Sequence, residues 1–361
     1  MRVSHVISPG PMAGAENVVL QGCAALLQQG HSLSLLVLTE ARCPEHGALF
    51  AAAARERDIP VQEISVERRL DIRALATLRA ALKAADVEVV HAHGYKALVY
   101  SMLTSSRRTR LAVTHHGETG HDSLARIYEA LARTLYRRVD CVFAVSNATS
   151  DALIEAGVPR AKLKTVPNPV SLPQPTPGAA DDSPGAPLLF IGRLSEEKGL
   201  DVLLRALASP NAPAGLTLNV AGDGPCAERW KALGSELGLN GKVRWLGMRK
   251  DVPELLASAQ ALVLPSLREG LPLAVLEAAS CGVPVLASRV GGVPEAVQEG
   301  ETAVLIAPGD VQGWSRALAA LPARGDELRK AAQRRAPEIR ARHAPARWAE
   351  LTTQHYCEVA R

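Results

Sequence analysis

The 361-residue sequence lacks the features that mark several classes of protein. No stretch approaches the roughly 18 consecutive apolar residues of a membrane-spanning helix. The opening MRVSHVISPGP has neither the basic start nor the apolar run of a secretory signal. The six cysteines include no C-x-x-C pair, which disfavours a zinc site or a disulfide framework. We therefore expect a cytoplasmic chain whose cysteines are reduced and serve mostly as small core residues.

Motifs of nucleotide-driven and redox enzymes are also missing. The Walker A pattern G-x-x-x-x-G-K-[ST] does not occur, and no G-x-G-x-x-G follows the first apolar run. No D-x-D occurs either. ATPases and NAD-dependent dehydrogenases are therefore disfavoured.

Aromatic residues make up 3% of the chain and the formal net charge is +4, too little of either to predict binding to nucleic acid. Residues 1–170 hold 20 Lys and Arg against 16 Asp and Glu, whereas residues 171–361 hold 21 of each. The basic clusters of the first half are Arg68-Arg69, Arg107-Arg108-Arg110 and Arg137-Arg138. A solvated surface explains them, and the alternative is contact with anionic lipid headgroups or a charged acceptor.

What the chain does contain is an alternation of short apolar runs and helical patterns. The length exceeds what one core usually organises, so we expect two domains. The alternation predicts doubly wound parallel sheets with helices on both faces. Residues 171–187, SLPQPTPGAADDSPGAP, predict a linker between a first domain at 1–170 and a second at 188–343. A helix within 344–361 is expected to pack back towards the first domain.

The expected strands lie in two groups. Those of the first domain are 3–7, 33–38, 60–64, 87–93, 111–116, 141–146 and 162–167, with a helix over about 15–29. Those of the second domain are 188–192, 216–221, 243–246, 261–264, 283–287 and 303–306. Ligands of open α/β sheets bind at the carboxyl ends of the strands, so two such domains predict a cleft there.

Two cations follow the first expected strand of the second domain. In GRLSEEKG (192–199), Arg193 and Lys198 leave the carboxyl end of that strand and approach the start of a helix. This placement suits binding of a diphosphate. A pair of solvated loop cations is the alternative.

Three loops of the first domain end strands at the corresponding edge. Gly14 lies in a glycine-bearing turn, SPGPMAGAE, and would let the backbone approach a phosphate or sugar, although an ordinary turn also explains it. Thr114-His115-His116-Gly117 ends another strand, where a histidine is placed to contact a ligand hydroxyl. His91 and His93 share one face of a strand, but the sequence places no third metal ligand beside them.

Glu269 and Glu277 flank an apolar run in SLREGLPLAVLEAASCGVPVLAS (266–288). Gly270 and Pro272 argue against one continuous helix, so we place Glu269 in a loop and Pro272 near the first helical position. Glu277 then lies about a turn and a half inside the helix. The free amides of the first turn point beyond the loop. Spacing alone is equally consistent with two surface acids.

Several of these motifs, in this order along almost the full chain, resemble the retaining glycosyltransferases of family four, which have the GT-B fold. The second domain carries G-x-L-x-x-x-K-G at 192–199, AGDGP at 221–225, and Glu269-x7-Glu277 followed by GVPV. The first domain carries the Gly14 loop, VVHAHG (89–94), VTHHG (113–117), AVSNAT (144–149) and VPNPV (166–170).

The resemblance implies a role for each matching residue. Arg193 and Lys198 would neutralise the donor diphosphate and the charge that develops as the sugar leaves. Glu269 would hold hydroxyls of the donor sugar, and Glu277 would accept hydrogen bonds from the ribose. Further donor contacts are implied at Gly192, Gly222, Gly270, Leu271 and Leu273, and at Met248 and Arg249 in the base-recognition segment 247–250.

Two residues of the first domain would complete the site. His116, directly before glycine as in the family motif, would contact the sugar, with His115 as the alternative. Gly14 would bring its amide to the diphosphate. The family often has Gly-Gly in that loop, and Ala13 replaces the first glycine here.

The missing D-x-D fits GT-B enzymes, which use cations and helix amino ends in place of a metal, so the resemblance implies no metal and no cofactor beyond the nucleotide diphosphate sugar. Such enzymes retain the anomeric configuration, and the leaving phosphate takes the proton of the acceptor. No enzymic base is implied.

The implied activity is transfer of a hexose or related sugar, from UDP ahead of GDP, to a glycolipid or glycan acceptor in cell-surface polysaccharide or lipopolysaccharide synthesis. The inner face of the cytoplasmic membrane would be its place of action. A sugar-nucleotide 2-epimerase of the hydrolysing GT-B type is one alternative, although its acid and base residues do not map onto these motifs. A non-catalytic nucleotide-sugar binder is the other.

Overall fold

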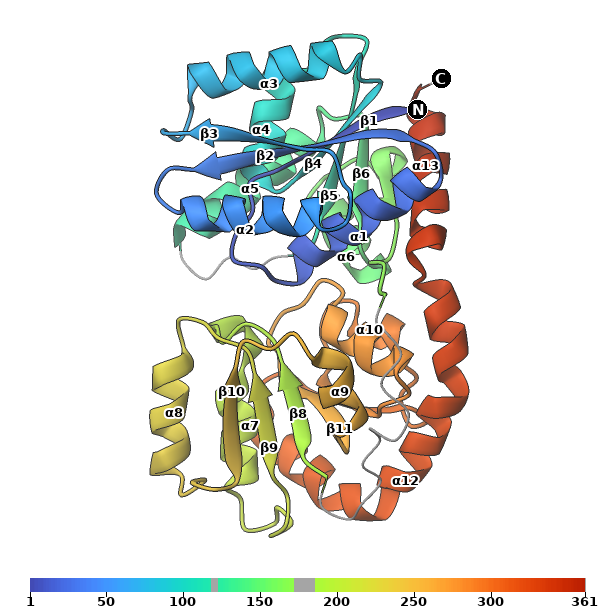
Figure 1. Cartoon of the computed structure of the whole chain (residues 1–361). Coiled ribbons are helices and arrows are strands. Elements are labelled where there is room, and N and C mark those ends of the chain that lie inside the picture. The colour runs from blue at the N-terminus through green and yellow to red at the C-terminus, as the bar shows by residue number, and fades with distance from the viewer. Residues whose placement is uncertain (118–122, 172–185, 361) are drawn as a thin grey trace. The chain divides into compact units, whose positions relative to one another are not determined.

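The computed structural model describes residues 1–117, 123–171 and 186–360 (Figure 1). These form two compact units, one made of Met1–Pro169 with His343–Arg361 and the other of Val170–Arg342. Most of the expected linker, residues 172–185, lies outside the described residues. Each unit is built on one parallel sheet, as the alternating pattern predicted.

The first unit contains a seven-stranded sheet in the order β3-β2-β1-β4-β5-β6-β7, and all its pairings are parallel. Each expected strand of both units is present, with its ends within two residues of the expected ones. The strands are β1 (Arg2–Ile7), β2 (Ser32–Glu40), β3 (Val61–Val66), β4 (Val89–His93), β5 (Arg110–His115), β6 (Cys141–Ala144) and β7 (Leu163–Thr165).

Helices cover both faces of this sheet because alternate strand residues point to opposite sides. Val6 and Leu36 pack with one group of helices, whereas Val3 and Leu35 pack with the other. Figure 1 shows α3 and α2 on opposite sides of the strands. The first group is α3 (Ile72–Ala84), α4 (Tyr95–Thr104), α5 (Ser123–Tyr136) and α6 (Asn147–Glu155), and the second is α1 (Gly14–Gln28), α2 (Pro44–Arg55) and α13 (Pro345–Ala360).

The second unit contains a six-stranded parallel sheet in the order β10-β9-β8-β11-β12-β13. Its strands are β8 (Leu188–Ile191), β9 (Leu218–Ala221), β10 (Val243–Gly247), β11 (Ala261–Leu264), β12 (Val285–Ser288) and β13 (Ala303–Ile306). Its helices are α7 (Leu200–Leu207), α8 (Ala227–Glu236), α9 (Val252–Ala257), α10 (Leu273–Ser280), α11 (Val293–Ala296) and α12 (Val311–Arg342).

Both sheets reverse their strand order at the first strand. β1 lies between β2 and β4, and β8 lies between β9 and β11. In each sheet the loops after two neighbouring strands, β1 and β4 or β8 and β11, therefore run in opposite directions from the carboxyl ends of those strands. Open α/β sheets bind ligands at this point. This topology brings the chain after Ile7 close to His93, and the chain after Ile191 close to the loop that follows Leu264.

None of the described helices is long and apolar enough to cross a membrane. All six cysteines lie in the described part of the chain and are free thiols. Cys23, Cys141 and Cys226 are buried, as expected for core residues, whereas Cys357, on α13, is exposed.

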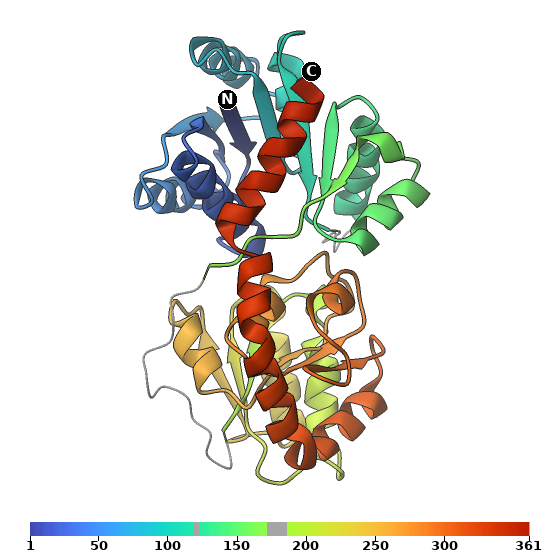
Figure 2. The ribbon, with the colours of Figure 1, turned by 90° about the vertical axis from the view of Figure 1, so that its right-hand side faces the viewer.

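Helix α13 belongs to the first unit and packs against α1 (Figure 2). The aromatic ring of Trp348 covers Gly22, where an added Cβ would lie 2.6 Å from the ring. Tyr356 and Ala349 of the same helix are fully buried. The Trp348 ring can therefore pack against α1 only because position 22 is glycine.

Replacing Trp348 with alanine is expected to lower the free energy of unfolding by about 3 kcal/mol, because the residue is 7% exposed and its removal leaves a cavity over Gly22. Urea denaturation followed by circular dichroism measures the loss. Arg347→Ala on the same helix is the control, since it removes only an exposed ion pair with Glu350. Equal stability of the two variants would contradict the packing role of Trp348.

Candidate active site

Two loops of the second unit meet at the carboxyl ends of β8 and β11, which are neighbouring strands. The amide of Leu267 donates to the carbonyl of Glu197 at 2.7 Å. Beside this contact, Lys198 Nζ lies 2.6 Å from Glu269 Oε1. The two side chains are 19% and 8% exposed, so the ion pair is largely removed from water. Two residues singled out from separate motifs therefore contact each other directly.

Ser266 completes this group, because its hydroxyl donates to the same Glu269 Oε1 at 2.6 Å. No described residue hydrogen-bonds the second carboxylate oxygen of Glu269. The carboxylate is thus oriented by two donors on one oxygen and keeps the other oxygen for a ligand. Sequence reasoning missed Ser266, although its position three residues before Glu269 in the loop was a usable signal.

Arg193 lies two residues after the end of β8 and is exposed. Within the described part of the chain its guanidinium has no hydrogen bond or ion pair. It therefore carries an uncompensated positive charge at the edge where Lys198 and Glu269 meet. An anion bound at this edge would be its natural partner.

Gly192 and Gly222 are brought together by close packing of their loops. A Cβ on Gly222, whose φ is 147°, would lie 1.9 Å from the carbonyl oxygen of Gly192. A Cβ on Gly224 would lie 2.5 Å from that of Leu194. The glycines of AGDGP thus have a packing reason that does not depend on a ligand.

A second pair of glycines supports the Glu269 loop. A Cβ on Gly291 would lie 1.9 Å from the carbonyl oxygen of Glu269, and the amide of Gly292 donates to the carbonyl of Gly270 at 2.6 Å. Sequence reasoning did not single out this Gly-Gly, which lies three residues after the end of β12. Gly270 itself is buried.

Helix α10 begins at Leu273, after Pro272. Pro272 lies next to the first helical position, as expected. Its ψ of 125° is extended, so it is the cap residue, and its carbonyl accepts from the amide of Leu276 at 3.3 Å. No side chain caps the helix, so its first amides remain unused by the helix. Leu271 and Leu273 are buried beside them.

Glu277 lies on α10, away from the loop that holds Glu269. Burial raises the pKa of this carboxyl to about 7. Its carboxylate has no hydrogen-bond partner within the described ranges. A desolvated carboxyl without a donor is costly for folding and is typical of a position that receives donors from a ligand.

Met248 and Arg249 follow β10 and differ in their surroundings. Met248 is 66% exposed. Arg249 forms a two-bond ion pair with Asp251, at 2.5 and 2.8 Å. The guanidinium is therefore already bound to its own neighbour, which leaves the Met248 side chain and the backbone of this segment for the predicted base contact.

Gly14 and His116 belong to the first unit, and all the other predicted site residues belong to the second. Gly14 is the first residue of α1, and no side chain caps that helix. Ala13 before it has a φ of −144°, extended backbone that any residue adopts, so the missing glycine at 13 causes no strain. The free amides at the start of α1 suit an anion.

His116 lies beyond β5, with its Nε2 3.3 Å from His93 Nδ1. Its Nδ1 has no hydrogen-bond partner among the described residues. His115 Nδ1 instead contacts the hydroxyl of Tyr136 at 3.1 Å. His116 thus offers a nitrogen to a ligand, whereas the Nδ1 of His115 is occupied.

β1 supplies the third histidine that the sequence did not place beside His91 and His93. His5, His91 and His93 are buried and their ligand atoms lie within 4.8 Å of one another. However, His5 Nδ1 and His93 Nε2 hydrogen-bond each other at 2.9 Å, and both nitrogens of His91 contact hydroxyl groups. These bonds make the cluster a hydrogen-bond network rather than an open set of metal ligands.

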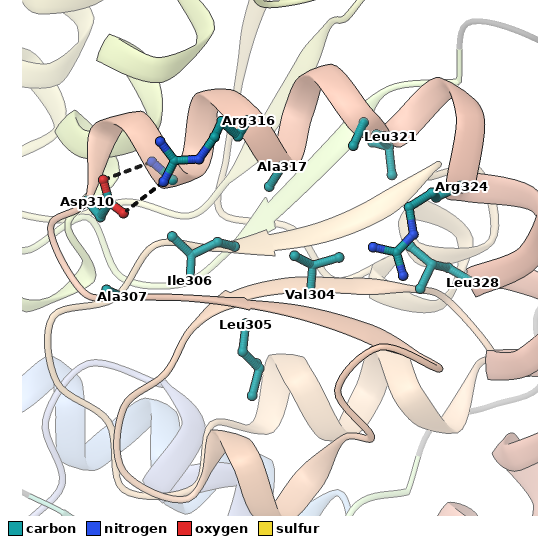
Figure 3. Close-up of a pocket in the computed structure, with 12 residues that line it drawn as sticks. Val304, Leu305, Ile306, Ala307, Asp310, Arg316, Ala317, Leu321, Arg324 and Leu328 are labelled. Carbon is teal, nitrogen blue, oxygen red and sulfur yellow. Dashed lines mark hydrogen bonds and ion pairs between the residues drawn. The ribbon is translucent and has the colours of Figure 1, made fainter.

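A cavity of about 350 Å³ lies elsewhere in the second unit, between β13 and α12 (Figure 3). Its polar groups are engaged: Asp310 accepts from the amide of Gly313 at 2.8 Å and pairs with Arg316 at 3.7 Å. Arg324 donates to the carbonyl of Gly300 at 3.4 Å. None of the predicted site residues lines this cavity. The size of the cavity therefore does not make it the candidate active site.

Two family models match the chain. A model described as Glycosyltransferase Family 4 matches residues 12–173, and a model described as Glycosyl transferases group 1 matches residues 186–323. The first match covers most of the first unit and extends four residues beyond Pro169, and the second falls within the other unit.

The chain is also similar to curated proteins. D-inositol 3-phosphate glycosyltransferase of Mycobacterium sp. (strain KMS) is 36% identical over 148 residues, 40% of this chain and 34% of that protein. The protein of the same name from Corynebacterium urealyticum is 35% identical over 165 residues, 43% of this chain and 39% of that protein. The match thus spans less than half the length of these relatives.

Solved structures share the whole fold. HepE of Anabaena, in complex with UDP and glucose, has a TM-score of 0.84 at 23% identity, with 99% of both chains covered. Sucrose-phosphate synthase of Thermosynechococcus elongatus has a TM-score of 0.81 at 20% identity, covering 99% of this chain and 98% of that one. The predicted GT-B fold, with two Rossmann-like domains, is confirmed.

Glu277→Gln is expected to stabilise the ligand-free protein at pH 8 and to change little at pH 5. Because the folded pKa is raised from 4.5 to about 7, the contribution of this carboxyl to stability is complete below pH 4.5 and is lost as the pH rises through 7. The loss that the variant avoids reaches about 3 kcal/mol. Thermal denaturation of both proteins at the two pH values measures it.

The control for this prediction is Glu228→Gln, which changes an exposed carboxylate on α8. Its effect on the melting temperature should not follow the same pH dependence. If Glu277→Gln had the same effect at pH 5 and pH 8, the carboxyl would not be buried in the manner described.

Proposed function

We propose that this chain, which belongs to the family 4 glycosyltransferases, transfers a sugar from a nucleotide diphosphate donor with retention of anomeric configuration. The observation that carries the proposal is the largely buried Lys198–Glu269 pair at the carboxyl end of the second sheet. Arg193, at the same end, has no hydrogen bond or ion pair with any described residue. A ligand that joins a polyanion to hydroxyl groups suits this site, because the cations would bind the polyanion and the Glu269 carboxylate would accept hydrogen bonds from the hydroxyl groups. A nucleotide diphosphate sugar is such a ligand.

Arg193 and Lys198 neutralise the diphosphate in this proposal. Charge accumulates on the diphosphate as the bond to the sugar breaks, so fixed cations stabilise the transition state more than the ground state. Lys198 is held in place by Glu269 before the donor arrives. Its position therefore needs little reorganisation during the reaction.

Glu269 accepts hydrogen bonds from hydroxyls of the donor sugar through the carboxylate oxygen that Lys198 and Ser266 leave open. The amides at the start of α10, around Gly270, Leu271 and Leu273, contact the sugar and phosphate. Gly192 and Gly222 let the backbone lie close to the donor.

Glu277 accepts the ribose hydroxyls. Its raised pKa, and the lack of a hydrogen-bond partner among the residues that the structure describes, support this role. Two hydroxyl donors would stabilise the ionised carboxylate and offset its burial. The backbone of 247–250, with Met248 and Arg249, borders the base. Gly14 contributes its amide to the diphosphate, and His116 contacts the sugar through Nδ1.

The donor is a UDP-sugar ahead of a GDP-sugar. HepE of Anabaena, whose fold this chain shares, has been solved with UDP, with UDP and glucose, and with UDP-glucose. The acceptor is a glycan or a lipid-linked glycan in the synthesis of cell-surface polysaccharide or lipopolysaccharide, at the cytoplasmic face of the membrane. The leaving phosphate takes the proton of the acceptor, so no side chain is assigned as a base.

Ligand binding and turnover together test the proposal. Thermal shifts with UDP, GDP and ADP should be largest for UDP, since a ligand stabilises the folded state according to its affinity. Incubation with UDP-glucose alone and with a glycan acceptor then separates the activities. Epimer formation would favour a 2-epimerase, and binding without turnover on any acceptor would favour a non-catalytic binder.

The reaction is expected to need no metal. Arg193, Lys198 and the start of α10 supply the positive charge that a divalent cation would otherwise provide. Turnover should be the same in EDTA and in added Mg²⁺, measured as UDP release. A loss of rate in EDTA that Mg²⁺ restores would contradict this expectation.

Lys198→Ala and Glu269→Ala should each lower kcat/KM by about 10²-fold or more, because each removes one partner of a fixed site and leaves the other misplaced. Circular dichroism checks that the variants fold. Lys231→Ala removes an ion pair of similar length, 2.7 Å to Glu228, on an exposed helix and should retain activity. Wild-type rates in either site variant would overturn the assignment.

The basic clusters of the first unit do not form one surface. Arg107 and Arg108 precede β5 and Arg137 and Arg138 precede β6, at the amino end of the sheet, whereas Arg68-Arg69 follows β3 at the opposite end. We propose that the amino end contacts anionic membrane.

Leu103, near the end of α4, and Leu131, in the second half of α5, are 48% and 45% exposed and would add apolar contact to this surface. Sedimentation at low salt should show binding to phosphatidylglycerol vesicles. Arg107→Glu/Arg108→Glu should reduce pelleting, whereas Arg68→Glu/Arg69→Glu should change it much less. No pelleting of the wild type would remove this part of the proposal.

A further inference from the structure

Behind His116, a chain of hydrogen bonds runs through the first unit to the carboxy-terminal helix. His116 Nε2 contacts His93 Nδ1 at 3.3 Å, and His93 Nε2 contacts His5 Nδ1 at 2.9 Å. His5 Nε2 lies 3.5 Å from the hydroxyl of Tyr356. The chain therefore links the proposed sugar contact to helix α13.

A branch of the chain ends on β5. The Tyr356 hydroxyl lies 2.5 Å from His91 Nδ1, and His91 Nε2 lies 2.6 Å from the hydroxyl of Thr114. Strands β1, β4 and β5 are neighbours, and the register pairs His5 with His91 and His93 with Thr114. The parallel sheet thus places His5, His91, His93 and Thr114 on one face, the face that α13 covers.

The four histidines of this hydrogen-bond network, His5, His91, His93 and His116, are neutral at neutral pH. Burial lowers the pKa of His5 to about 3 and that of His116 to about 4. Burial holds the pKa values of His91 and His93 well below the ordinary value, and the neighbouring rings lower them further. A neutral imidazole has one N–H and one lone pair, so each ring must donate on one side and accept on the other.

This rule leaves two arrangements of protons in the hydrogen-bond network. In one, every bond runs from donor to acceptor in the opposite direction to the other. The hydroxyl of Tyr356 has one proton, and the shorter contact, to His91 Nδ1, is where a phenol donates best. His5 Nε2 must then donate to the phenol oxygen, and His5 Nδ1 must accept from His93.

The same reasoning continues to the proposed sugar contact. His93 donates through Nε2, so its Nδ1 accepts from the Nε2–H of His116. His116 is thereby left with a lone pair on Nδ1, the atom that has no partner within the described residues. Reversing the order moves one proton along each bond, takes up a proton at His116 Nδ1 and releases one from the Thr114 hydroxyl. The net charge is then unchanged, and Nδ1 becomes a donor.

We propose that Tyr356 and Thr114, acting through His91, His5 and His93, fix His116 as a hydrogen-bond acceptor, so that it selects a hydroxyl group that donates to it. Tyr356, Thr114 and the three inner histidines are positioning residues, and only His116 touches the ligand. This inference rests on the proposed function for the identity of that ligand, a sugar hydroxyl. The direction of the hydrogen bonds in the network is itself a property of the ligand-free protein.

The test reads the tautomer of His116 directly in the free protein. In a sample labelled with ¹⁵N-histidine, the resonances of His116, assigned with His116→Asn, should show an unprotonated Nδ1 and a protonated Nε2. Tyr356→Phe removes the proton that sets the order, and the Nδ1 resonance should move towards the protonated position. Unchanged His116 resonances in Tyr356→Phe would overturn the proposal.

Two further sets of variants separate this effect from general damage to the fold. Tyr136→Phe removes the same group from the neighbouring Tyr136–His115 pair, which lies outside the chain, and should leave the His116 resonances unchanged. Thr114→Val breaks the chain at its other end and should move them, whereas Thr114→Ser keeps the hydroxyl and should preserve them. If Tyr356→Phe does not fold, the comparison of Thr114→Val with Thr114→Ser tests whether the hydrogen-bond network sets the tautomer of His116.

Turnover supplies the link to function. Tyr356→Phe should lower kcat/KM for the donor by a few-fold to about tenfold, the size of one hydrogen bond, while thermal stabilisation by UDP alone stays close to that of the wild type. Failure of the wild type to transfer sugar would defeat the proposed function and leave the resonance test intact. Moved resonances with an unchanged kcat/KM would overturn the selection of a sugar hydroxyl.

Discussion

The buried ion pair between Lys198 and Glu269 is the constraint on which the candidate site depends. Removing both charges from water costs several kcal/mol, so the two loops must meet in one geometry for the charges to compensate each other. The adjacency of β8 and β11 brings the loops together, and glycines let them approach closely. A Cβ at Gly199 would lie 2.5 Å from the carbonyl of Pro265, and one at Gly291 would lie 1.9 Å from that of Glu269. A ligand at this edge therefore meets groups that are already oriented.

Much of the fold could be predicted from the sequence because its signals are local. Alternation of apolar runs with helical patterns reveals the strands, and proline and glycine mark the ends of elements. The loop position of Glu269 and the helical position of Glu277 followed from Gly270 and Pro272 in this way. The neighbouring strands of each sheet did not follow from local signals, since pairing of β8 with β11 joins residues about seventy positions apart.

The contacts within the site were the part that sequence reasoning could not reach. Nothing local indicates that Lys198 binds Glu269, or that β1 brings His5 to His91 and His93. The glycines also showed two roles that a motif does not distinguish. Gly222 is required by the close approach of Gly192, whatever it does for a ligand. Resemblance to a family located the residues, and the sheet topology explained why they occur together.

The chain passes between the two units twice, after Pro169 and again after Arg342. In topological terms the second unit is an insertion in the first, whose fold is closed only when α13 returns to cover α1. A fragment that stops at the proline-rich segment would expose Gly22 and the inner side of the histidine chain to water. The first unit is therefore completed last during synthesis, after the whole second unit has already left the ribosome.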